Sequence, residues 1–599
     1  DHVADDYRSS ICVVALDGTT RELVPATSTN SYPRWSPDGH ELAFLSSREG
    51  STALYVMSRD GGEARRVKGF DRAVVALAWR PDGAAILATV LVNHEPDRPA
   101  HAPRHITRQR YKSDSSGDLT TSTTRLYWIK LADGSTTEPT GADQEVMGAA
   151  VSPDGRRIAY ARSRTGPRDS HEADIWMVDA DGSNARRLTH RVPSASSPAW
   201  SPDGKYIVFT GNEEPGNSMS RLWLLDLERG GDAEPLGDDR VDITSYPLTR
   251  ARAPLWTPEG KRVLYVSARE GTSDIGAVEI ATRERERVVG GDGQIVAFHG
   301  AAETLAMVTV SIQSPGDIKI TTMRGGSPRQ LTHLNAWWHE RVAIRAERVE
   351  LGDDVAGWLI SGPDTPSPAP LFVDVHGGPQ SFAELGFPYH VYWWVLCSRG
   401  WRVLALNPCG SSSYGPEHAR SLRSRWGELD LPQQLAAVDE LVRRHIADDR
   451  IAIGGKSYGG YLAAWAIGHT QRFRAAIVSA PVTNLESHAG TSDSGYYVDA
   501  YDLEGPVHER HELARRLSPV QYAHLATTPT LILQGEDDER CPAGQSEELF
   551  AILMRVGKAP VEMVLYPRGH HDLAEAGRPS HRIDYHRRIV DWLERWGRT

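Results

Sequence analysis

Two patterns of apolar and polar residues divide the chain. Up to about residue 334, short, partly alternating segments such as KYIVFTG follow tight turns, and alternation is typical of a strand with one buried face. Beyond that point, segments such as APLFVDV (369–375) and RIAIGG (450–455) are almost continuously apolar, which indicates strands buried on both faces. We therefore predict two domains, residues 1–334 and residues 335–599.

The first pattern belongs to a repeat. One turn-forming phrase occurs five times, as WSPDG at Trp35 and Trp200, WRPDG at Trp79, VSPDG at Val151 and WTPEG at Trp256. Proline presets φ in such a turn, and glycine takes a positive φ. Successive copies start 44 to 72 residues apart, and propeller blades repeat about every 40 to 50 residues. We expect a β-propeller of about seven blades, with further units at 8–26 and 293–333 and an insertion at 97–125.

In the second pattern, helical segments alternate with the buried strands. Examples are LPQQLAAVDELVRRHI (431–446) and, last in the chain, RIDYHRRIVDWLERW (582–596). Strand and helix in alternation predict a parallel sheet with helices on both faces. Ligands of such sheets bind at the carboxyl ends of the strands.

Ser457 stands where the buried strand RIAIGG turns directly into the helix YGGYLAAWAIG. Such a turn needs small neighbours, and GKSYG (455–459) has the GxSxG form of a nucleophile elbow. The elbow places the hydroxyl at a helix N-terminus, where the N–H of Tyr458 can stabilise an oxyanion. A second donor is expected from Gly378 in HGGP (376–379), which follows another buried strand. These features predict an α/β-hydrolase domain with Ser457 as nucleophile.

A serine nucleophile needs a histidine base and an acid that orients the histidine. In this fold the acid and then the histidine follow the serine, on later strand ends. The strand PTLILQG is followed by Asp537 and Asp538, and the strand VEMVLYP by His570 and His571. Each loop therefore offers two candidates.

Composition narrows the function classes. The chain has 599 residues, 40% hydrophobic and 24% charged, which is typical of a globular protein. Its net charge of −12 argues against a nucleic acid or an anionic membrane as partner, since either needs a basic face. No window approaches 18 uncharged apolar residues, so no transmembrane helix is predicted. We expect free thiols in a reducing, cytoplasmic compartment, and neither a metal nor another cofactor, because the four cysteines are widely spaced (12, 397, 409 and 541).

Together these segments resemble the prolyl oligopeptidase family of serine peptidases, most closely its acylaminoacyl-peptidase branch. In that family the acid stands in an Asp-x-Arg motif, which implies Asp538, and the spacing of the histidine from Tyr-Pro and Pro-Ser-His motifs implies His571. The resemblance also implies that Arg540 contacts a substrate carbonyl. It covers nearly the whole chain and rests on RYKSDSSG (110–117), the SPDG turns, HGGP, NPCGSSSYG, WGELD, GGKSYGGY, RFRAAIVSAPVTN, PTLILQGEDDERCP and GRPSHRI.

Three positions depart from the family pattern. Lys456 stands beside the nucleophile where a glycine or an apolar residue is usual. Its cation would either favour an acidic substrate group or point to solvent, and we expect the latter. Cys409 replaces a usual arginine and Ser412 a usual glycine. The usual anchoring of that loop is therefore not expected here.

The predicted function is hydrolysis of short peptides by a Ser-His-Asp triad. The same machinery would serve an amidase or esterase for one small natural product. A propeller interaction protein with an idle hydrolase domain is a third alternative, against which the intact triad argues. An aminopeptidase or dipeptidyl peptidase needs carboxylates on the propeller to bind a free amine, and Glu213 and Glu214 are the candidate pair.

Two expectations concern substrate choice. Tyr496, Tyr497 and Tyr501 follow a strand end near Ser457, where they either line an apolar pocket for the residue before the cleaved bond or pack their own loop. The propeller is expected to cover the carboxyl ends of the strands and to limit substrates to about ten residues or fewer. A homo-oligomer is compatible with this organisation.

Overall fold

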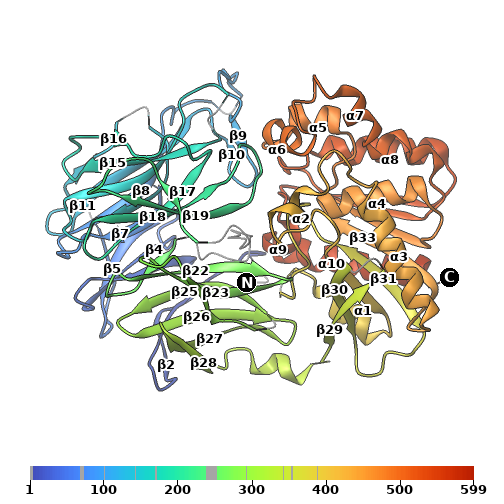
Figure 1. The fold of residues 1–599 in the computed structure, drawn as a ribbon, viewed down its shortest axis with the longest axis horizontal. Coiled ribbons are helices and arrows are strands. Elements are labelled where there is room, and N and C mark those ends of the chain that lie inside the picture. Colours follow the sequence, from blue (N-terminus) through green and yellow to red (C-terminus); the bar gives the residue numbers. More distant parts are fainter. Residues whose placement is uncertain are drawn as a thin grey trace.

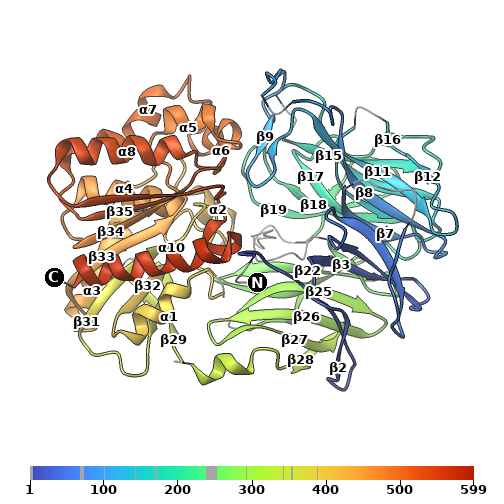
Figure 2. The same ribbon diagram turned by 180° about the vertical axis from the view of Figure 1, so that it is seen from behind.

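The computed structural model of the chain contains two bodies that lie side by side (Figure 1). One is built from small antiparallel sheets, and the other is a single large sheet with helices around it (Figure 2). None of the described helices is both long and apolar enough to cross a membrane. The structure describes residues 4–67, 73–99, 101–141, 144–168, 171–237, 253–291, 293–341, 343–352, 355–386 and 389–598.

Six four-stranded sheets form the blades of the propeller in the described part of the chain. Their strands are, blade by blade, β3 (Asn30–Trp35), β4 (Glu41–Ser46), β5 (Ala53–Ser58) and β6 (Arg65–Arg66); β7 (Ala73–Trp79), β8 (Ala85–Asn93), β11 (Ser122–Lys130) and β12 (Thr136–Thr137); β13 (Val146–Val151), β14 (Arg157–Ser163), β15 (Ala173–Asp179) and β16 (Arg186–Arg187); β17 (Ala195–Trp200), β18 (Tyr206–Asn212), β19 (Ser220–Asp226) and β20 (Glu234–Pro235); β21 (Leu255–Trp256), β22 (Arg262–Arg269), β23 (Thr272–Glu279) and β24 (Arg285–Val289); and β25 (Gln294–Ala301), β26 (Thr304–Ser311), β27 (Ser314–Thr322) and β28 (Gly325–Gln330).

This count corrects the expectation of about seven blades. Residues 8–26, expected to be the outer strands of a further blade, form a sheet of only two strands, β1 (Ile11–Val14) and β2 (Thr20–Val24). The unit expected at 293–333 is present as β25 to β28. The expected insertion at 97–125 contains a separate hairpin, β9 (Lys112–Ser113) and β10 (Gly117–Asp118).

The repeated phrase has two structural roles. Its glycine has a φ between +69° and +72° in all five copies (39, 83, 155, 204 and 260), as a tight turn between two strands requires. In at least two of the copies the tryptophan also connects blades: the indole N–H of Trp79 donates to the carbonyl oxygen of Arg34 at 2.9 Å, and that of Trp200 to the carbonyl oxygen of Ala150 at 3.1 Å. In each pair the acceptor lies on the first strand of the preceding blade.

The second body contains an eight-stranded sheet in the order β29-β30-β32-β31-β33-β34-β35-β36. β30 pairs antiparallel with β29 and β32, and from β32 to β36 all neighbours are parallel. Every residue of β31, β34 and β35 is buried. The strands are β29 (Arg345–Leu351), β30 (Val355–Ser361), β31 (Ala369–Val375), β32 (Arg402–Leu406), β33 (Ala447–Lys456), β34 (Ala475–Ser479), β35 (Thr530–Gly535) and β36 (Val561–Tyr566).

Helices cover both faces of this sheet. The side chains of Leu371 and Val373 pack into a core with α3, α4 and α8, whereas Phe372 between them packs on the opposite face with α1 and α10. Because neighbouring residues of a strand face opposite sides, both faces must be apolar. The helices are α1 (Val391–Ser398), α2 (Pro416–Arg420), α3 (Asp430–Arg443), α4 (Tyr458–His469), α5 (Leu485–Thr491), α6 (Gly495–Asp502), α7 (His511–Arg516), α8 (Ala543–Val556), α9 (Leu573–Ala576) and α10 (Pro579–Trp592), with shorter turns η1 (Ala336–Glu340), η2 (Pro519–Gln521), η3 (Ala523–Leu525) and η4 (Leu593–Gly597).

The two bodies contact each other at several places. Residue 334, the predicted end of the first domain, lies in the connection between β28 and β29, and the boundary itself stays a prediction. The N-terminal segment reaches α10, where the backbone N–H of Ser580 donates to Asp5 Oδ1 at 2.8 Å. The hairpin of β9 and β10 lies beside α6 in both views (Figure 1, Figure 2).

Candidate active site

Ser457 lies at the sharp turn between β33 and α4. Its φ is 63°, an uncommon value for a residue other than glycine. The neighbouring backbones approach closely: a Cβ atom at Gly455 would lie 2.3 Å from the carbonyl oxygen of Val375, and one at Gly459 would lie 2.0 Å from the same oxygen. Only glycine fits at these two positions, which is why the serine has glycines around it.

The structure brings His571 and Asp538 together. His571 Nδ1 lies 2.8 Å from Asp538 Oδ2, on loops that follow β36 and β35. The other oxygen, Asp538 Oδ1, accepts hydrogen bonds from the backbone N–H groups of Arg540 (2.9 Å) and Cys541 (2.7 Å). The side chain of Asp538 is fully buried (0% exposed), and that of His571 is largely covered (11% exposed).

The other two candidates lie differently. Asp537 is exposed to solvent. His570 Nδ1 accepts a hydrogen bond from the backbone N–H of Asp572 at 3.1 Å, which fixes its ring within its own loop. Of the two aspartates and the two histidines that the sequence offered, only Asp538 and His571 contact each other as an acid and a base would.

Ser457 itself has an unexpected neighbour. Its Oγ lies 3.9 Å from Sγ of Cys541, a buried thiol two positions before α8 begins. Within the described residues, Ser457 Oγ and His571 form no hydrogen bond. In serine hydrolases without substrate this bond is often long and tightens only in the complex. In the sequence Cys541 is one of four widely spaced cysteines, and its position does not indicate that it lies beside Ser457.

The two expected oxyanion donors lie on adjacent segments. Tyr458 is the first residue of α4, so its N–H lacks an intrahelical acceptor. Gly378 follows β31 and has a φ of +123°. A Cβ atom at Gly459 would lie 3.2 Å from the carbonyl oxygen of His376, which shows how closely the loop after β31 packs on this helix end. The helix dipole at this end favours a negative charge on a bound group.

The environment of His571 favours its charged form. Burial alone lowers the pKa of the imidazole, but the carboxylate of Asp538 and the neighbouring Cys541 outweigh burial, and the pKa is raised to about 9. Lys456 acts in the opposite direction. An imidazolium formed during the reaction would be stabilised by Asp538.

This raised pKa predicts the pH dependence of activity. As the predicted base, His571 would accept a proton only when it is neutral, so a pKa above the ordinary value of about 6.5 moves the acid limb of kcat/KM to higher pH. We expect the rate on an uncharged substrate to keep rising above pH 7. The measurement is a pH profile of kcat/KM between pH 5 and pH 10, and an acid limb at or below about pH 6.5 would contradict the prediction.

Arg540 has a fixed orientation. Its Nε lies 2.6 Å from Asp493 Oδ1, and Nη2 lies 3.2 Å from Asp493 Oδ2. Nearly half of the side chain is nevertheless exposed (45%). Its carbonyl oxygen is held by the buried imidazole of His488 (Nε2, 2.9 Å), whose Nδ1 lies 2.8 Å from Asp499. That Arg540 contacts a substrate carbonyl stays a prediction.

The three tyrosines lie at the contact with the propeller. Tyr497 stacks on the ring of His171 with centroids 4.3 Å apart, and Tyr496 meets the same ring edge-on at 5.3 Å. Tyr501 donates from its hydroxyl to Glu214 Oε1 at 2.9 Å. That they line a substrate pocket stays a prediction.

Glu213 and Glu214 are engaged by arginines. Arg420 of α2 donates to Glu214 Oε1 at 2.8 Å and to Glu213 Oε2 at 3.2 Å. Arg221 lies 3.2 Å from Glu213, and Arg423 lies 3.9 Å from Glu214. The two carboxylates thus face three guanidinium groups, from both bodies.

The expectation for Lys456 was wrong. Its side chain does not point to solvent but forms ion pairs with Glu575 and, at 3.5 Å, with Asp572. The side chain is 23% exposed. The cation beside the nucleophile is thereby paired with one carboxylate of the loop that follows His571 and one of α9.

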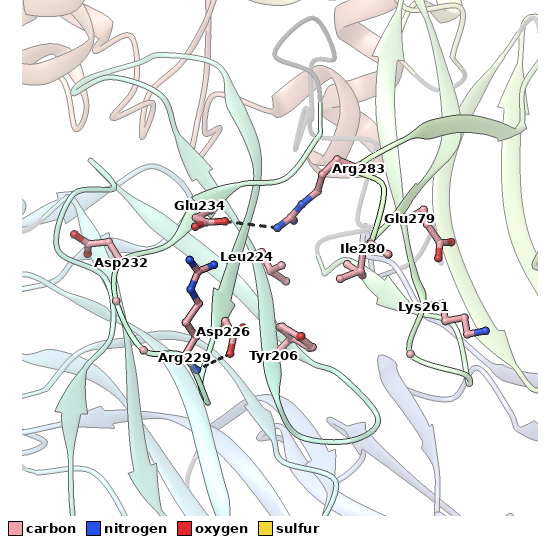
Figure 3. Close-up of a pocket in the computed structure, with 14 residues that line it drawn as sticks. Tyr206, Leu224, Asp226, Arg229, Asp232, Glu234, Lys261, Glu279, Ile280 and Arg283 are labelled. Carbon is pink, nitrogen blue, oxygen red and sulfur yellow. Dashed lines mark hydrogen bonds and ion pairs between the residues drawn. The ribbon is translucent and has the colours of Figure 1, made fainter.

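One pocket on the propeller is separate from these residues. It has a volume of about 480 Å³ and lies between the blade of β17 to β20 and the blade of β21 to β24 (Figure 3). Charged side chains line it, among them Glu234 and Arg283, which form an ion pair of 3.6 Å. All lining residues fall within 206–283, so no predicted catalytic residue borders this pocket. Among the described residues, no group of three His, Cys, Asp or Glu side chains is placed to hold a metal ion.

Comparison with known proteins gives one consistent result. Residues 387–598 match the model of the prolyl oligopeptidase family. The uncharacterized peptidase YuxL of Bacillus subtilis (strain 168) is 30% identical over 628 residues, covering 98% of this chain and 94% of that protein. Dipeptidyl-peptidase 5 of Porphyromonas gingivalis is 26% identical over 624 residues, covering 97% and 89%. The structure of Pyrococcus horikoshii acylaminoacyl peptidase has a TM-score of 0.85 at 22% identity, covering 100% of this chain and 93% of that one.

Proposed function

Because this chain belongs to the prolyl oligopeptidase family and is a serine peptidase, we propose that it cleaves short peptides by attack of Ser457, with His571 as the base and Asp538 as the acid that orients it. The observation that carries the proposal is the buried pair of His571 and Asp538 at 2.8 Å, on the loops after β36 and β35. In a parallel sheet these loops emerge at the same edge as the turn that holds Ser457.

The chemistry follows from these positions. Ser457 Oγ attacks the peptide carbonyl while its proton passes to Nε2 of His571, since Nδ1 is held by Asp538. The N–H groups of Tyr458 and Gly378 receive the negative charge that develops on the carbonyl oxygen. His571 then gives the proton to the leaving amine, and a water molecule repeats the sequence to release the acyl group from Ser457.

We further propose that the preferred substrates have blocked N-termini, as in the acylaminoacyl-peptidase branch. To bind a free amine, a site needs a carboxylate whose negative charge is not already balanced by a neighbouring cation. Glu213 and Glu214 supply two charges against those of Arg221, Arg420 and Arg423, so this cluster has no net attraction for an ammonium group. The dipeptidyl-peptidase alternative is less favoured for this reason.

Matched peptides test this proposal. An N-acetylated peptide is expected to be cleaved with a kcat/KM at least about tenfold higher than the same peptide with a free amine, because the ammonium is desolvated beside guanidinium groups without compensation. Liquid chromatography of the products gives the rate and the cleaved bond. Faster removal of a dipeptide from the free peptide would contradict the proposal, and Glu214→Gln would then identify the anchor if it abolished that preference.

Four finer features are further proposals. All four cysteines are free, which supports a reducing, cytoplasmic compartment. The propeller contacts the loops after β34, β35 and β36, which supports a restriction to short substrates. We also propose the domain boundary after residue 334. Because Tyr496, Tyr497 and Tyr501 lie where the propeller meets the hydrolase body, we propose that they line the substrate pocket.

A further inference from the structure

A hairpin of the propeller carries a buried carboxylate into the hydrolase body. β9 and β10 flank a short turn, and Asp114 lies at its start. A side chain on a hairpin turn is normally exposed to solvent, yet that of Asp114 is only 8% exposed. Residues of the hydrolase body contact it, and the hairpin that carries it lies beside α6 (Figure 1, Figure 2).

The carboxylate of Asp114 binds the backbone of both loops that hold the proposed acid and base. Asp114 Oδ1 accepts from the N–H of Glu539 at 3.1 Å and from the N–H of His571 at 3.1 Å. Asp114 Oδ2 lies 3.2 Å from the N–H of His571. Glu539 directly follows Asp538, so one carboxylate joins the loop after β35 to the loop after β36. Hydrogen bonds from N–H groups to an ionised carboxylate are stronger than neutral ones.

The hairpin is itself held in place. The backbone N–H of Asp114 donates to Asp493 Oδ2 at 2.7 Å, and Asp493 also binds Arg540. Lys112 donates to the carbonyl oxygen of Thr491 at 2.6 Å and pairs with Glu539. The hairpin therefore contacts the loop between α5 and α6 as well, and its tip has little freedom to leave the two catalytic loops.

We propose that Asp114 is a positioning residue for catalysis, which holds the backbone of His571 and of the residue after Asp538 so that the imidazole stays directed at Ser457. The proposal rests on the triad proposed above. It assigns to the propeller a part in the chemical step, in addition to any effect on substrate size. Small displacements matter here, because misplacing a catalytic group by about 1 Å can cost about a hundredfold in rate.

Asp114 also adds charge to the site. Burial and the nearby Asp538 raise the pKa of Asp114, while His571 lowers it. Because the attraction between two charges is mutual, ionised Asp114 in turn favours the protonated form of His571. The titratable and charged groups that face Asp114 or His571 are Lys112, Lys456, Asp493, Asp538, Glu539, Arg540, Cys541, His570 and Asp572.

The experiment compares three variants of the full chain. Asp114→Ala removes the hydrogen bonds, Asp114→Asn keeps the size but removes the charge, and Asp118→Asn is the matched control. Asp118 lies on the same hairpin, but its carboxylate binds Thr120, Arg98 and Arg104 within the propeller. For each variant, kcat, KM and the pH profile are measured on a short acetylated chromogenic peptide, together with the thermal midpoint and the rate of labelling by a fluorophosphonate.

We expect Asp114→Ala to lower kcat and the labelling rate by about 10- to 100-fold with KM within about threefold. Asp114→Asn should lose less of kcat than Asp114→Ala does. The acid limb of its pH profile should move to lower pH, because a negative charge near His571 has been removed. Asp118→Asn should match the parent chain. A role in docking alone would lower the thermal midpoint without moving the pH profile.

Three results would overturn the proposal: a kcat of Asp114→Ala within about twofold of the parent, an increase in KM at constant kcat, or an equal loss in Asp118→Asn. If Asp114→Ala does not fold, the pH profile of Asp114→Asn decides, and an unmoved acid limb counts against the proposal. Failure of the triad itself gives a different result, since Ser457→Ala would then retain turnover in the same assay.

Discussion

Ser457→Ala is expected to lower kcat by about 10⁶-fold, the loss seen when a serine hydrolase loses its nucleophile. Alanine removes the hydroxyl that would form the acyl intermediate, and the nearby thiol of Cys541, 3.9 Å from Ser457 Oγ, lies on another loop. Alanine keeps the backbone at this turn, so the loss should be chemical rather than structural. The measurement is turnover of an acetylated peptide together with covalent labelling by a fluorophosphonate.

A matched control is Ser398→Ala. Ser398 ends α1, is exposed, and its hydroxyl donates to the carbonyl oxygen of Val395 at 2.7 Å. This variant should label and turn over as the parent chain does. If Ser457→Ala still labels, peptide mapping would identify the reacting residue, and labelling of Cys541 or of another serine would refute the assignment of the nucleophile.

His571→Ala is expected to lower kcat by about 10³-fold or more, because it removes the base and leaves Asp538 buried without its partner. Its neighbour provides the control. His570 Nδ1 accepts from the backbone of Asp572, so His570→Ala should cost about tenfold at most, through a looser loop. Both variants are compared by steady-state kinetics at the optimal pH of the parent chain.

Exogenous imidazole sharpens this comparison. A small base that diffuses into the space left by the ring can restore part of the turnover of His571→Ala but not of Ser457→Ala. If His570→Ala were the inactive variant and His571→Ala the active one, the assignment of the base would be off by one residue. The buried pair at 2.8 Å would then be a structural contact only.

The parts of the site that local sequence could predict are those set by local geometry. The elbow at Ser457 is one, since glycines at fixed offsets from a serine, between a buried strand and a helix, are typical of this turn. The two loops after β35 and β36 are another, although each offered two candidates, and the choice came from the family resemblance. In the structure, Asp538 from the first pair contacts His571 from the second pair.

Contacts between distant segments could not be predicted in this way. Asp114 is separated from His571 by 457 positions, and nothing in the period of either segment indicates that they meet. The same holds for Glu214 and Arg420, which are 206 positions apart. In the sequence Glu214 looks like a free carboxylate, but in the structure it forms an ion pair with Arg420. The orientation of the Lys456 side chain was predicted wrongly for the same reason. Its partner, Glu575, lies in a distant segment, beyond the loop of His571.

The number of blades was also difficult to read from sequence. The outer strands β6, β12, β16 and β20 have only two residues each, which is too short for a recognisable alternation. The turns between the inner strands carried the signal instead. Where the turn phrase was absent, as at residues 8–26, strand content alone suggested a blade that the structure does not complete.

The bonds from the indole of one blade to the backbone of the preceding blade affect how the protein should resist unfolding. Apolar side chains from neighbouring blades also share one core, as where Leu54 and Val56 pack with Ile86 and Ala88. Contacts at the boundaries between blades therefore add to the stability that each blade has by itself. Removing one repeat would expose two apolar surfaces at once, so the ring is expected to melt as one cooperative unit and to tolerate shortening poorly.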